Sequence, residues 1–194
     1  MEWSNWRNSK IFWKFIKEKY GKPCLKKDFV LPERVETSKG TNPLEERIGY
    51  HSYDDKGNPL QVSKKDGTQI VYIWGYNKTL PVAKIENVTY SQITSSVFGI
   101  QAASNQDNDR TTDTVATNGV ITYQGQEGAL RNALKNLRNS LPTNALMTSF
   151  TYDPLIGTTS ITDPRGRTIY YIYDSFNRLK YVKDHEGKVL SKTE

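Results

Sequence analysis

The sequence predicts a mainly β protein with α insertions, built from tandem antiparallel β-hairpins of one repeated type together with two or three helices. Three observations support this prediction. Short runs rich in Tyr, Ile, Val and Thr alternate with turn-forming residues, a pattern typical of strands joined by tight turns. The same unit recurs at a fixed spacing. Only 36% of the residues are hydrophobic and Tyr outnumbers the other aromatic residues, with 12 Tyr against 6 Phe and 4 Trp, which suits thin, partly solvated sheets.

One unit appears twice between residues 147 and 192. Its first copy runs from Tyr152-Asp153 to Gly166, and its second copy runs from Tyr173-Asp174 to Gly187. In both copies the Tyr precedes the Gly by 14 residues, and the two Tyr residues lie 21 residues apart. A constant spacing of this kind indicates tandem copies of one supersecondary unit.

The same spacing occurs further upstream. Tyr53-Asp54 is followed 14 residues later by Gly67, and Trp74-Gly75 stands 21 residues after Tyr53-Asp54. The acidic residue is missing from the Trp-Gly pair. The sequence therefore predicts two tandem couples of one repeat unit, with the two residues of each pair and the turn Gly as its signature positions.

Each unit has the pattern of a β-hairpin. One strand ends at the Tyr-Asp pair, turn formers follow, and a second strand leads to the Gly turn. The Asp residues are predicted to accept hydrogen bonds from turn N–H groups. Asp66-Gly67 suits a two-residue type I′ turn, in which both central residues have positive φ. Because a lone hairpin is marginal in water, such units are expected to pair edge to edge with neighbours.

These motifs carry a family resemblance. The stretch Tyr173-Asp-Ser-Phe-Asn-Arg-Leu179 resembles the YD repeat of RHS-repeat (rearrangement-hotspot) proteins, and the stretch from Tyr152 to Gly166 is similar to the preceding unit in such proteins. The likeness covers about residues 29 to 194. In that family, tandem YD hairpins spiral into a hollow β-shell, which in polymorphic toxins encloses a C-terminal effector. Some members are surface proteins with suggested carbohydrate binding.

The resemblance implies a non-enzymatic structural fragment of an RHS/YD-repeat shell, secreted or at the cell surface, whose partners are neighbouring repeats or further copies of the chain. The alternative is a small carbohydrate-binding or cell-surface adhesion module in which exposed aromatic side chains stack on sugar rings. Array membership predicts exposed strand edges, whereas an independent module predicts closed edges and an aromatic platform. The candidate stacking residues are Trp74, Tyr76, Tyr152, Tyr171, Tyr173 and Tyr181.

Four segments are predicted along the chain. They are a basic N-terminal segment (residues 1–27), a first β-hairpin repeat region (residues 28–87), a helical insertion with a polar loop (residues 88–144) and the YD-repeat hairpins (residues 145–194). Within the second segment, residues 69–74 are almost continuously apolar. We expect them to be buried on both faces as a cover lying over the sheet.

The N-terminal segment differs in charge from the remainder of the chain. Residues 1–27 contain eight Lys or Arg and two Glu, so they carry the whole net charge of +6. The remainder is neutral, and we predict no nucleic-acid partner. Residues 9–20 have apolar side chains at helical spacing and are predicted to form a basic amphipathic helix, which either packs on a sheet edge or contacts a membrane surface. The apolar run at residues 11–13 is too short for a signal peptide.

The insertion is predicted to contain two helices. Thr89 and Gln92 form a capping box that opens the first helix. Its apolar side consists of Tyr90, Ile93, Val97 and Phe98. The second helix follows Glu127 and ends before Pro142, and one of its faces carries a stripe of leucines. This stripe consists of Leu130, Leu134, Leu137 and Leu141. Such a stripe usually faces the core, and a partner's groove is the alternative.

The polar residues 104–113 between these helices are predicted to form a solvated loop. Asp107, Asp109 and Asp113 have some of the alternation of a calcium loop, which is the alternative interpretation. The Gly of the sharp turn and the terminal bidentate Glu are absent at the corresponding places.

No catalytic constellation is apparent in the sequence. It contains no Gly-rich phosphate loop, no metal-ligand spacing and no nucleophile elbow, so we predict neither an enzymatic activity nor a cofactor. Cys24 could nominally pair with His51 or His185, but no local feature activates the thiol. Solvent-facing His residues and a free Cys are the prediction.

Overall fold

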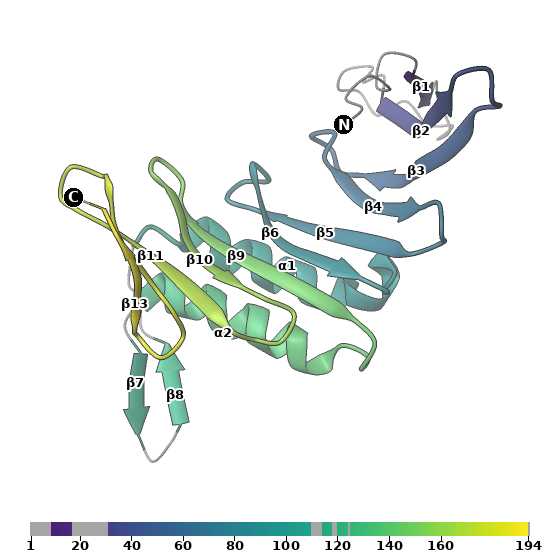
Figure 1. Ribbon diagram of the computed structural model, residues 1–194. Helices are drawn as coiled ribbons and strands as arrows, with labels where there is room; N and C mark the ends of the chain where they lie inside the picture. The colour runs from purple at the N-terminus through teal and green to yellow at the C-terminus, as the bar shows by residue number, and fades with distance from the viewer. Residues whose placement is uncertain (1–8, 17–30, 110–113, 118–119, 124, 194) are drawn as a thin grey trace. The chain divides into compact units, whose positions relative to one another are not determined.

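The computed structural model describes residues 9–16, 31–109, 114–117, 120–123 and 125–193. This part of the chain is mainly antiparallel β-sheet with two helices, as the sequence predicts (Figure 1). The chain divides into two compact units, Met1–Ile70 and Val71–Glu194, and each is described by itself. Neither helix among the described residues is both long enough and apolar enough to cross a membrane.

The described residues of the first unit form four strands that follow one another in both sequence and sheet order. They are β1 (Ser9–Ile16), β2 (Leu31–Lys39), β3 (Glu45–Tyr53) and β4 (Pro59–Lys64). Each strand pairs antiparallel with the next. Val35 of β2 and Val62 of β4 are buried, but most side chains of β3 are exposed. This unit is therefore a thin sheet with little core of its own.

The prediction of a helix at residues 9–20 is wrong in the described part of that segment, because Ser9–Ile16 is the strand β1 and pairs with β2. Residues 17–20 and Cys24 lie outside the described residues. Aromatic and β-branched residues dominate Ser9–Ile16 and favour a strand over a helix. An isolated helix of this length is marginal, whereas a partner strand satisfies the backbone hydrogen bonds of β1.

The second unit contains a larger sheet. In sheet order its strands are β5 (Gln69–Gly75), β6 (Leu80–Glu86), β9 (Leu146–Asp153), β10 (Gly157–Thr162), β11 (Thr168–Tyr173), β12 (Leu179–Lys183) and β13 (Val189–Lys192). From β6 to β13 each strand pairs antiparallel with the next. The prediction of consecutive antiparallel hairpins over residues 147–192 is confirmed.

The insertion between β6 and β9 supplies the helices that cover this sheet. It contains α1 (Tyr90–Gln106), the small hairpin β7 (Thr114–Thr117) and β8 (Val120–Tyr123), and α2 (Gly125–Ser140). Both helices lie on the same face of the sheet (Figure 1). The two predicted helices are confirmed, whereas the short hairpin between them has no counterpart in the sequence prediction.

The core of the second unit lies between the sheet and the helices. The leucine stripe of α2 faces it as predicted, since Leu130, Leu134 and Leu137 are at most 3% exposed. The buried apolar side chains of the other elements are Val71, Ile73, Val82, Ala83, Ile85, Ile93, Val97, Ile100 and Met147. Full burial of a side chain of this size contributes about 1.5–3 kcal/mol, so this cluster is the main source of stability in the unit.

Two expectations about this core are wrong. Residues 69–74 do not cover the sheet; β5 is one of its strands, with Val71 and Ile73 fully buried and Tyr72 and Trp74 half-buried. The helices provide the cover instead. Phe98 was placed on the apolar side of α1, but it is 81% exposed, and the buried face continues through Ile100.

The predicted start of α1 is confirmed. Thr89 is the N-cap residue, and the Gln92 side chain reaches back so that its Oε1 accepts the Thr89 N–H at 2.7 Å. The predicted solvated loop at residues 104–113 begins later than expected, because α1 continues to Gln106. Ser104 and Asp107 are 0% and 5% exposed, so this part of the polar stretch is buried.

Candidate functional site

The Asp residues of the repeat organise the hairpin turns. Four loops share one hydrogen-bond pattern, in which the Asp N–H donates to the carbonyl of the residue four positions later and the Asp carbonyl accepts the N–H three positions later. One carboxylate oxygen also accepts the N–H groups two and four positions later, at 2.8–3.0 Å. The four Asp residues are Asp54, Asp163, Asp174 and Asp184. The predicted role of the Tyr-Asp carboxylates as acceptors of turn N–H bonds is confirmed for Asp54 and Asp174, whereas Asp153 accepts one such bond, from the Leu155 N–H at 3.3 Å. Asp163 and Asp184, which precede the turn Gly, have the same role without having been predicted.

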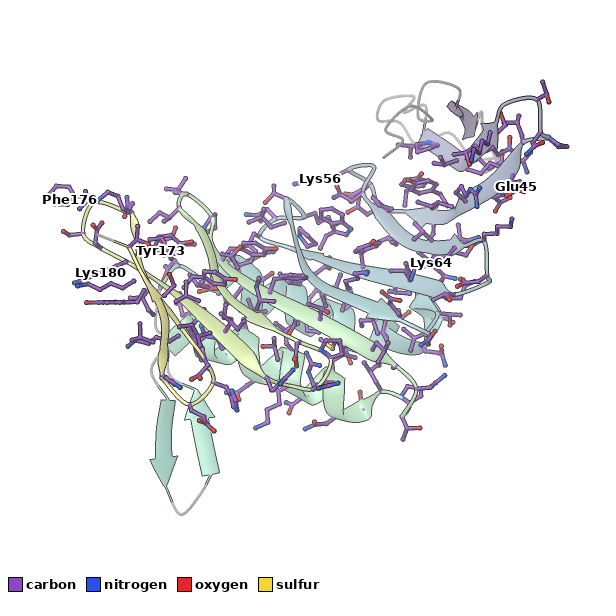
Figure 2. All side chains as sticks on the ribbon, viewed as in Figure 1. Glu45, Lys56, Lys64, Tyr173, Phe176 and Lys180 are labelled. Carbon is purple, nitrogen blue, oxygen red and sulfur yellow. The ribbon has the colours of Figure 1, made fainter. Side chains whose placement is uncertain are left out.

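The fourth residue of each loop has positive φ, which explains the turn Gly of the repeat. Gly57, Gly166 and Gly187 have φ of 82–83°, and Asn177 has φ of 62°. Glycine adopts this conformation without the steric cost that a Cβ imposes, and Asn tolerates it better than most other residues. Phe176, the residue before Asn177, is 79% exposed and projects from the loop tip (Figure 2).

The turn at Gly67 follows the same backbone pattern rather than the predicted one. Lys64 begins this loop, with its N–H bonded to the Thr68 carbonyl and its own carbonyl accepting the Gly67 N–H at 3.0 Å. Only Gly67 has positive φ, so the prediction of a type I′ turn with two such residues is wrong. A type I turn followed by one residue in the left-handed region accommodates Asp-Gly equally well.

The Tyr residues of the repeat make one shared contact. The hydroxyl groups of Tyr53, Tyr152 and Tyr173 donate to the carbonyls of Pro32, Pro81 and Thr158 at 2.5, 3.0 and 2.9 Å. In all three cases the acceptor is the second residue of the neighbouring strand that precedes the Tyr strand in sheet order. Tyr152 and Tyr173 are both half-buried, so the expectation that they have equivalent environments is confirmed.

Two signature pairs depart from this scheme. Asp153 begins a different turn, in which its carbonyl accepts the Ile156 N–H at 3.0 Å. Trp74-Gly75 contains no Asp and does not form the loop described above. The Trp74 carbonyl accepts the Gln101 side-chain amide of α1 at 2.9 Å, and a Cβ at Gly75 would collide with Ser104 of α1. At this pair, contact with a helix replaces the turn function.

Replacing Asp174 by Ala is expected to lower the melting temperature by a few degrees, because it removes the acceptor for the Phe176 and Arg178 N–H groups. These hydrogen bonds hold the pKa of Asp174 below its usual range, and the bond from the Arg178 N–H has the largest effect. A group whose pKa is lower in the folded state stabilises the fold at pH values above its unfolded-state pKa. This contribution is lost as the pH falls through the folded-state pKa. The melting temperatures of the variant and the wild type should therefore differ at pH 7 and differ much less at pH 3. Ser175→Ala is the control, and an equal loss in that control would contradict the assignment.

A second arrangement, which the sequence analysis did not identify, is a buried polar cluster between α1, α2 and the sheet. Glu127 of α2 is fully buried, and its Oε1 accepts the hydroxyl groups of Thr151 and Thr159, each at 2.7 Å. The guanidinium of Arg131, one turn further along α2, forms an ion pair with the same oxygen. Arg131 also lies over the Tyr170 ring, 5.1 Å from its centroid.

Two further carboxylates belong to this cluster. Asp109 accepts the N–H groups of Gln126 and Glu127 at 2.6 and 3.3 Å and so caps the N-terminus of α2. Asp107 Oδ2 accepts the hydroxyl of Tyr76 at 2.6 Å, and that hydroxyl in turn accepts the Tyr152 N–H at 2.9 Å. These two hydrogen bonds link Asp107 through Tyr76 to Tyr152, a tyrosine of the repeat.

Burial dominates the electrostatics of the cluster. It raises the pKa of Asp107 to about 7, against the lowering effect of the Tyr76 hydrogen bond. Burial also raises the pKa of Glu127 above its usual range, although the charge of Arg131 acts in the opposite direction. The sequence contains one indication of this cluster: Glu127 and Arg131 are four residues apart on α2, beside the leucine stripe. Charged residues at buried helix positions usually form pairs, so this spacing indicates a buried ion pair.

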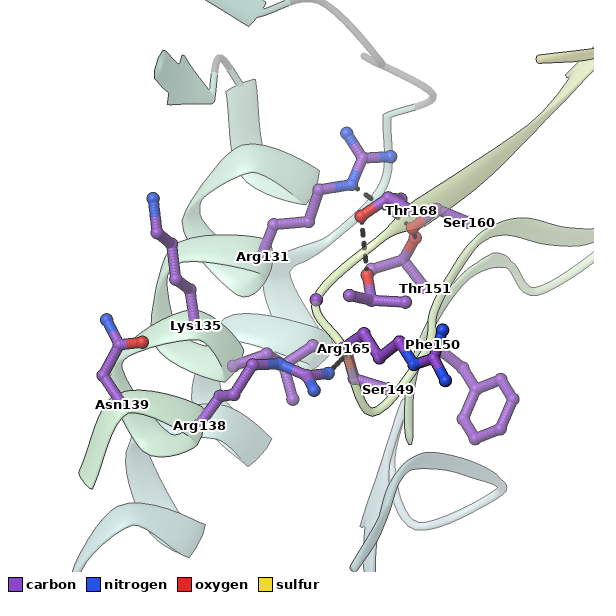
Figure 3. Close-up of a pocket in the computed structure, with 13 residues that line it drawn as sticks. Arg131, Lys135, Arg138, Asn139, Ser149, Phe150, Thr151, Ser160, Arg165 and Thr168 are labelled. Atoms are coloured by element: carbon purple, nitrogen blue, oxygen red, sulfur yellow. Dashed lines mark hydrogen bonds between the residues drawn. The ribbon is translucent and has the colours of Figure 1, made fainter. Parts of the chain in front are cut away.

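A basic pocket of about 390 Å³ lies between α2 and the strands β9 to β11 (Figure 3). Four of its lining residues are basic and none is acidic; the basic residues are Arg131, Lys135, Arg138 and Arg165. The Arg131 side chain extends from α2 toward Ser160 (Figure 3). Arg138 donates to the carbonyls of Met147 and Asp163 at 2.7 and 2.9 Å. The lining also includes hydroxyl groups of five Ser and Thr residues, together with Leu134, Asn139, Phe150 and Gly166.

The remaining sequence candidates that lie in the described part of the chain do not form a site. Tyr76 is only 4% exposed, so it does not belong to an aromatic platform, and the other five stacking candidates are half-buried. His51 is exposed, and its ring nitrogen Nε2 lies 2.8 Å from Ser63 Oγ. His185 is exposed in the Asp184 loop. Asp113 lies outside the described residues.

Comparison with known proteins gives no family assignment. No model of a protein family matches this chain, and no curated protein matches it.

Proposed function

We propose that this chain is a non-enzymatic structural segment of an RHS/YD-repeat shell, of the kind linked to toxin encapsulation and delivery. The observation that carries the proposal is the repeated hairpin unit. Three Tyr hydroxyls donate to equivalent backbone carbonyls, and four Asp carboxylates hold equivalent loops. A polar side chain that recurs at one structural position and is hydrogen-bonded to the backbone stabilises a repeat. A catalytic site requires side chains with different chemical roles that meet at one place.

The C-terminal strand supports pairing with further repeats. All four residues of β13 are exposed, and its two apolar side chains, Val189 and Leu190, are 47% and 54% exposed. Among the described strands, β13 pairs only with β12. An exposed strand edge presents unpaired N–H and C=O groups, which are a template for another strand. The partners that we propose are therefore neighbouring YD repeats or a second copy of this chain.

A location outside the cell or on its surface belongs to the same proposal and rests on the family resemblance.

Sedimentation velocity over a wide concentration range tests this proposal. We expect the wild-type chain to associate as concentration rises, and we expect Leu190→Lys to suppress the association because a charge on an edge strand opposes pairing. Leu155→Lys is the matched control, since Leu155 is 96% exposed in the loop between β9 and β10 and lies away from the edge. A wild-type monomer at every concentration, or equal effects of the two substitutions, would contradict the proposal.

The second candidate function is binding of a carbohydrate, and the basic pocket favours an acidic one. A cavity of about 390 Å³ with basic and hydroxyl groups is suited to carboxylated or sulfated sugars, because guanidinium groups bind such anions and hydroxyls bond sugar oxygens. Heparin can serve as the probe at several salt concentrations. Arg165→Ala should weaken its binding more than Lys188→Ala, which removes the same charge from an exposed turn. Equal losses would indicate a response to net charge alone.

A further inference from the structure

Two buried oxygen atoms of the carboxylate cluster lack partners. Asp107 Oδ1 and Glu127 Oε2 are inaccessible to solvent and accept no hydrogen bond from any described residue. The other oxygen of each carboxylate is occupied, by the Tyr76 hydroxyl for Asp107 and by Arg131, Thr151 and Thr159 for Glu127. A buried polar atom without a partner carries a large desolvation cost, so an unsatisfied carboxylate oxygen points to a missing ligand.

The position of the carboxylates also favours a cation. Asp107, Asp109 and Glu127 together carry three negative charges when ionised, and Arg131 is the basic residue paired with them. Asp107 also ends α1, where its N–H donates to the Ala103 carbonyl at 3.1 Å, and the C-terminal end of a helix favours a cation. The positive N-terminal end of α2 is already capped by Asp109. A cation at this position would therefore be favoured by the end of α1 as well as by the carboxylates.

We propose that Asp107, Asp109 and Glu127 bind a divalent cation of the calcium type between α1 and the start of α2. The carboxylate oxygens that these three residues offer all lie within 4.8 Å of one another. Calcium–oxygen distances of 2.3–2.6 Å place the ligands of one ion at most about 4.6–5.2 Å apart, so oxygens within 4.8 Å of one another can share a calcium ion. Calcium tolerates irregular ligand geometry, whereas magnesium requires a nearly ideal octahedron, and waters can complete the coordination of calcium.

The ligand set differs from a local calcium loop. Asp107 and Asp109 follow α1, but Glu127 comes from the first turn of α2, 18 residues after Asp109. A bound cation would therefore join the two helices that cover the sheet. Its role would be structural, and this inference is independent of whether the repeats pair with other chains.

Isothermal titration calorimetry with calcium chloride, on protein first treated with a chelator, tests the proposal. We expect one site per chain and a rise in melting temperature of about 5 to 10 °C at a calcium concentration 100-fold above Kd. Magnesium chloride should give a smaller shift. Asp107→Asn and Asp109→Asn should each weaken calcium binding by at least about tenfold, because each removes a charged ligand. Glu186→Gln, in an exposed turn, should leave the binding unchanged.

The outcomes are distinct. An absence of heat and of any thermal shift in the wild type would overturn the proposal, and would indicate that the carboxylates share protons instead. Calcium binding of wild-type strength in both Asn variants would assign the ion to another place and would also overturn it. Should an Asn variant fail to fold, as judged by circular dichroism, the stoichiometry and thermal shift of the wild type decide. None of these results bears on the association experiment with Leu190→Lys.

Discussion

Replacing Arg131 by Met is expected to lower the free energy of unfolding by about 3–5 kcal/mol, because it leaves the carboxylate of Glu127 buried without a counter-charge. Met has a similar length and packs as an apolar side chain, so lost volume is a minor contribution. Chemical denaturation at pH 7 in the presence of a chelator measures the loss. Lys135→Met, one turn further along α2 and exposed, should change the same free energy by less than about 0.5 kcal/mol.

The pH dependence gives a second test of the Arg131 prediction. Burial already raises the pKa of Glu127, and removal of the guanidinium should raise it further. A folded-state pKa above the unfolded-state value means that stability falls as pH rises, so the deficit of the variant should be small near pH 4 and large at pH 8. Adding Glu127→Gln to Arg131→Met should recover part of the lost stability. A double variant no more stable than the single one would contradict the buried-charge explanation.

Replacing Gly75 by Ala is expected to cost about 3 kcal/mol, the upper end of the usual range for overpacked cores. A Cβ at this position would lie 2.7 Å from Val82 Cγ1 and 2.8 Å from Ser104 Cβ, and would also collide with Ser104 Oγ. That hydroxyl accepts the Tyr76 N–H at 3.1 Å, so displacing it also breaks a buried hydrogen bond. The melting temperature should fall by roughly 10 °C.

Gly99→Ala provides the matched control for Gly75→Ala. Gly99 lies within α1, and a Cβ there would meet no atom within 4 Å. Because Ala has the higher helix propensity, this control should raise the free energy of unfolding by about 0.5–1 kcal/mol. A large loss at Gly75 together with a small gain at Gly99 would show that close packing at Gly75 is decisive. A neutral Gly75→Ala would contradict the contact between β5 and α1.

The parts of the fold that were predictable from the sequence depend on residues near one another in the chain. The Asp174 loop needs only five consecutive residues, and the leucine stripe of α2 needs only the helical period. The turn at Asp66-Gly67 was local as well, yet two turn types fit the same dipeptide. The segment Ser9–Ile16 was mistaken for a helix because a short apolar run satisfies both periodicities, and its pairing with β2 cannot be read from its own residues.

The buried carboxylate cluster was not predictable, because its contacts join distant residues. Glu127 meets Thr151 and Thr159, which are 24 and 32 positions away, and Tyr76 meets Asp107 across 31 positions. Asp107 looked like a loop residue because the sequence around it is polar. Its burial follows from the packing of α1 against the sheet, which no local pattern specifies.

Hydrogen–deuterium exchange at residues 189–192 tests most directly whether this chain is a strand-pairing segment of a repeat array. Amides that face outward from an edge strand exchange rapidly, and they become protected when another strand pairs with them. We predict that the β13 amides become protected as protein concentration rises, and that Leu190→Lys abolishes this protection while Leu155→Lys preserves it. Rapid exchange of β13 at every concentration, or protection that appears only elsewhere in the chain, would contradict the proposed function.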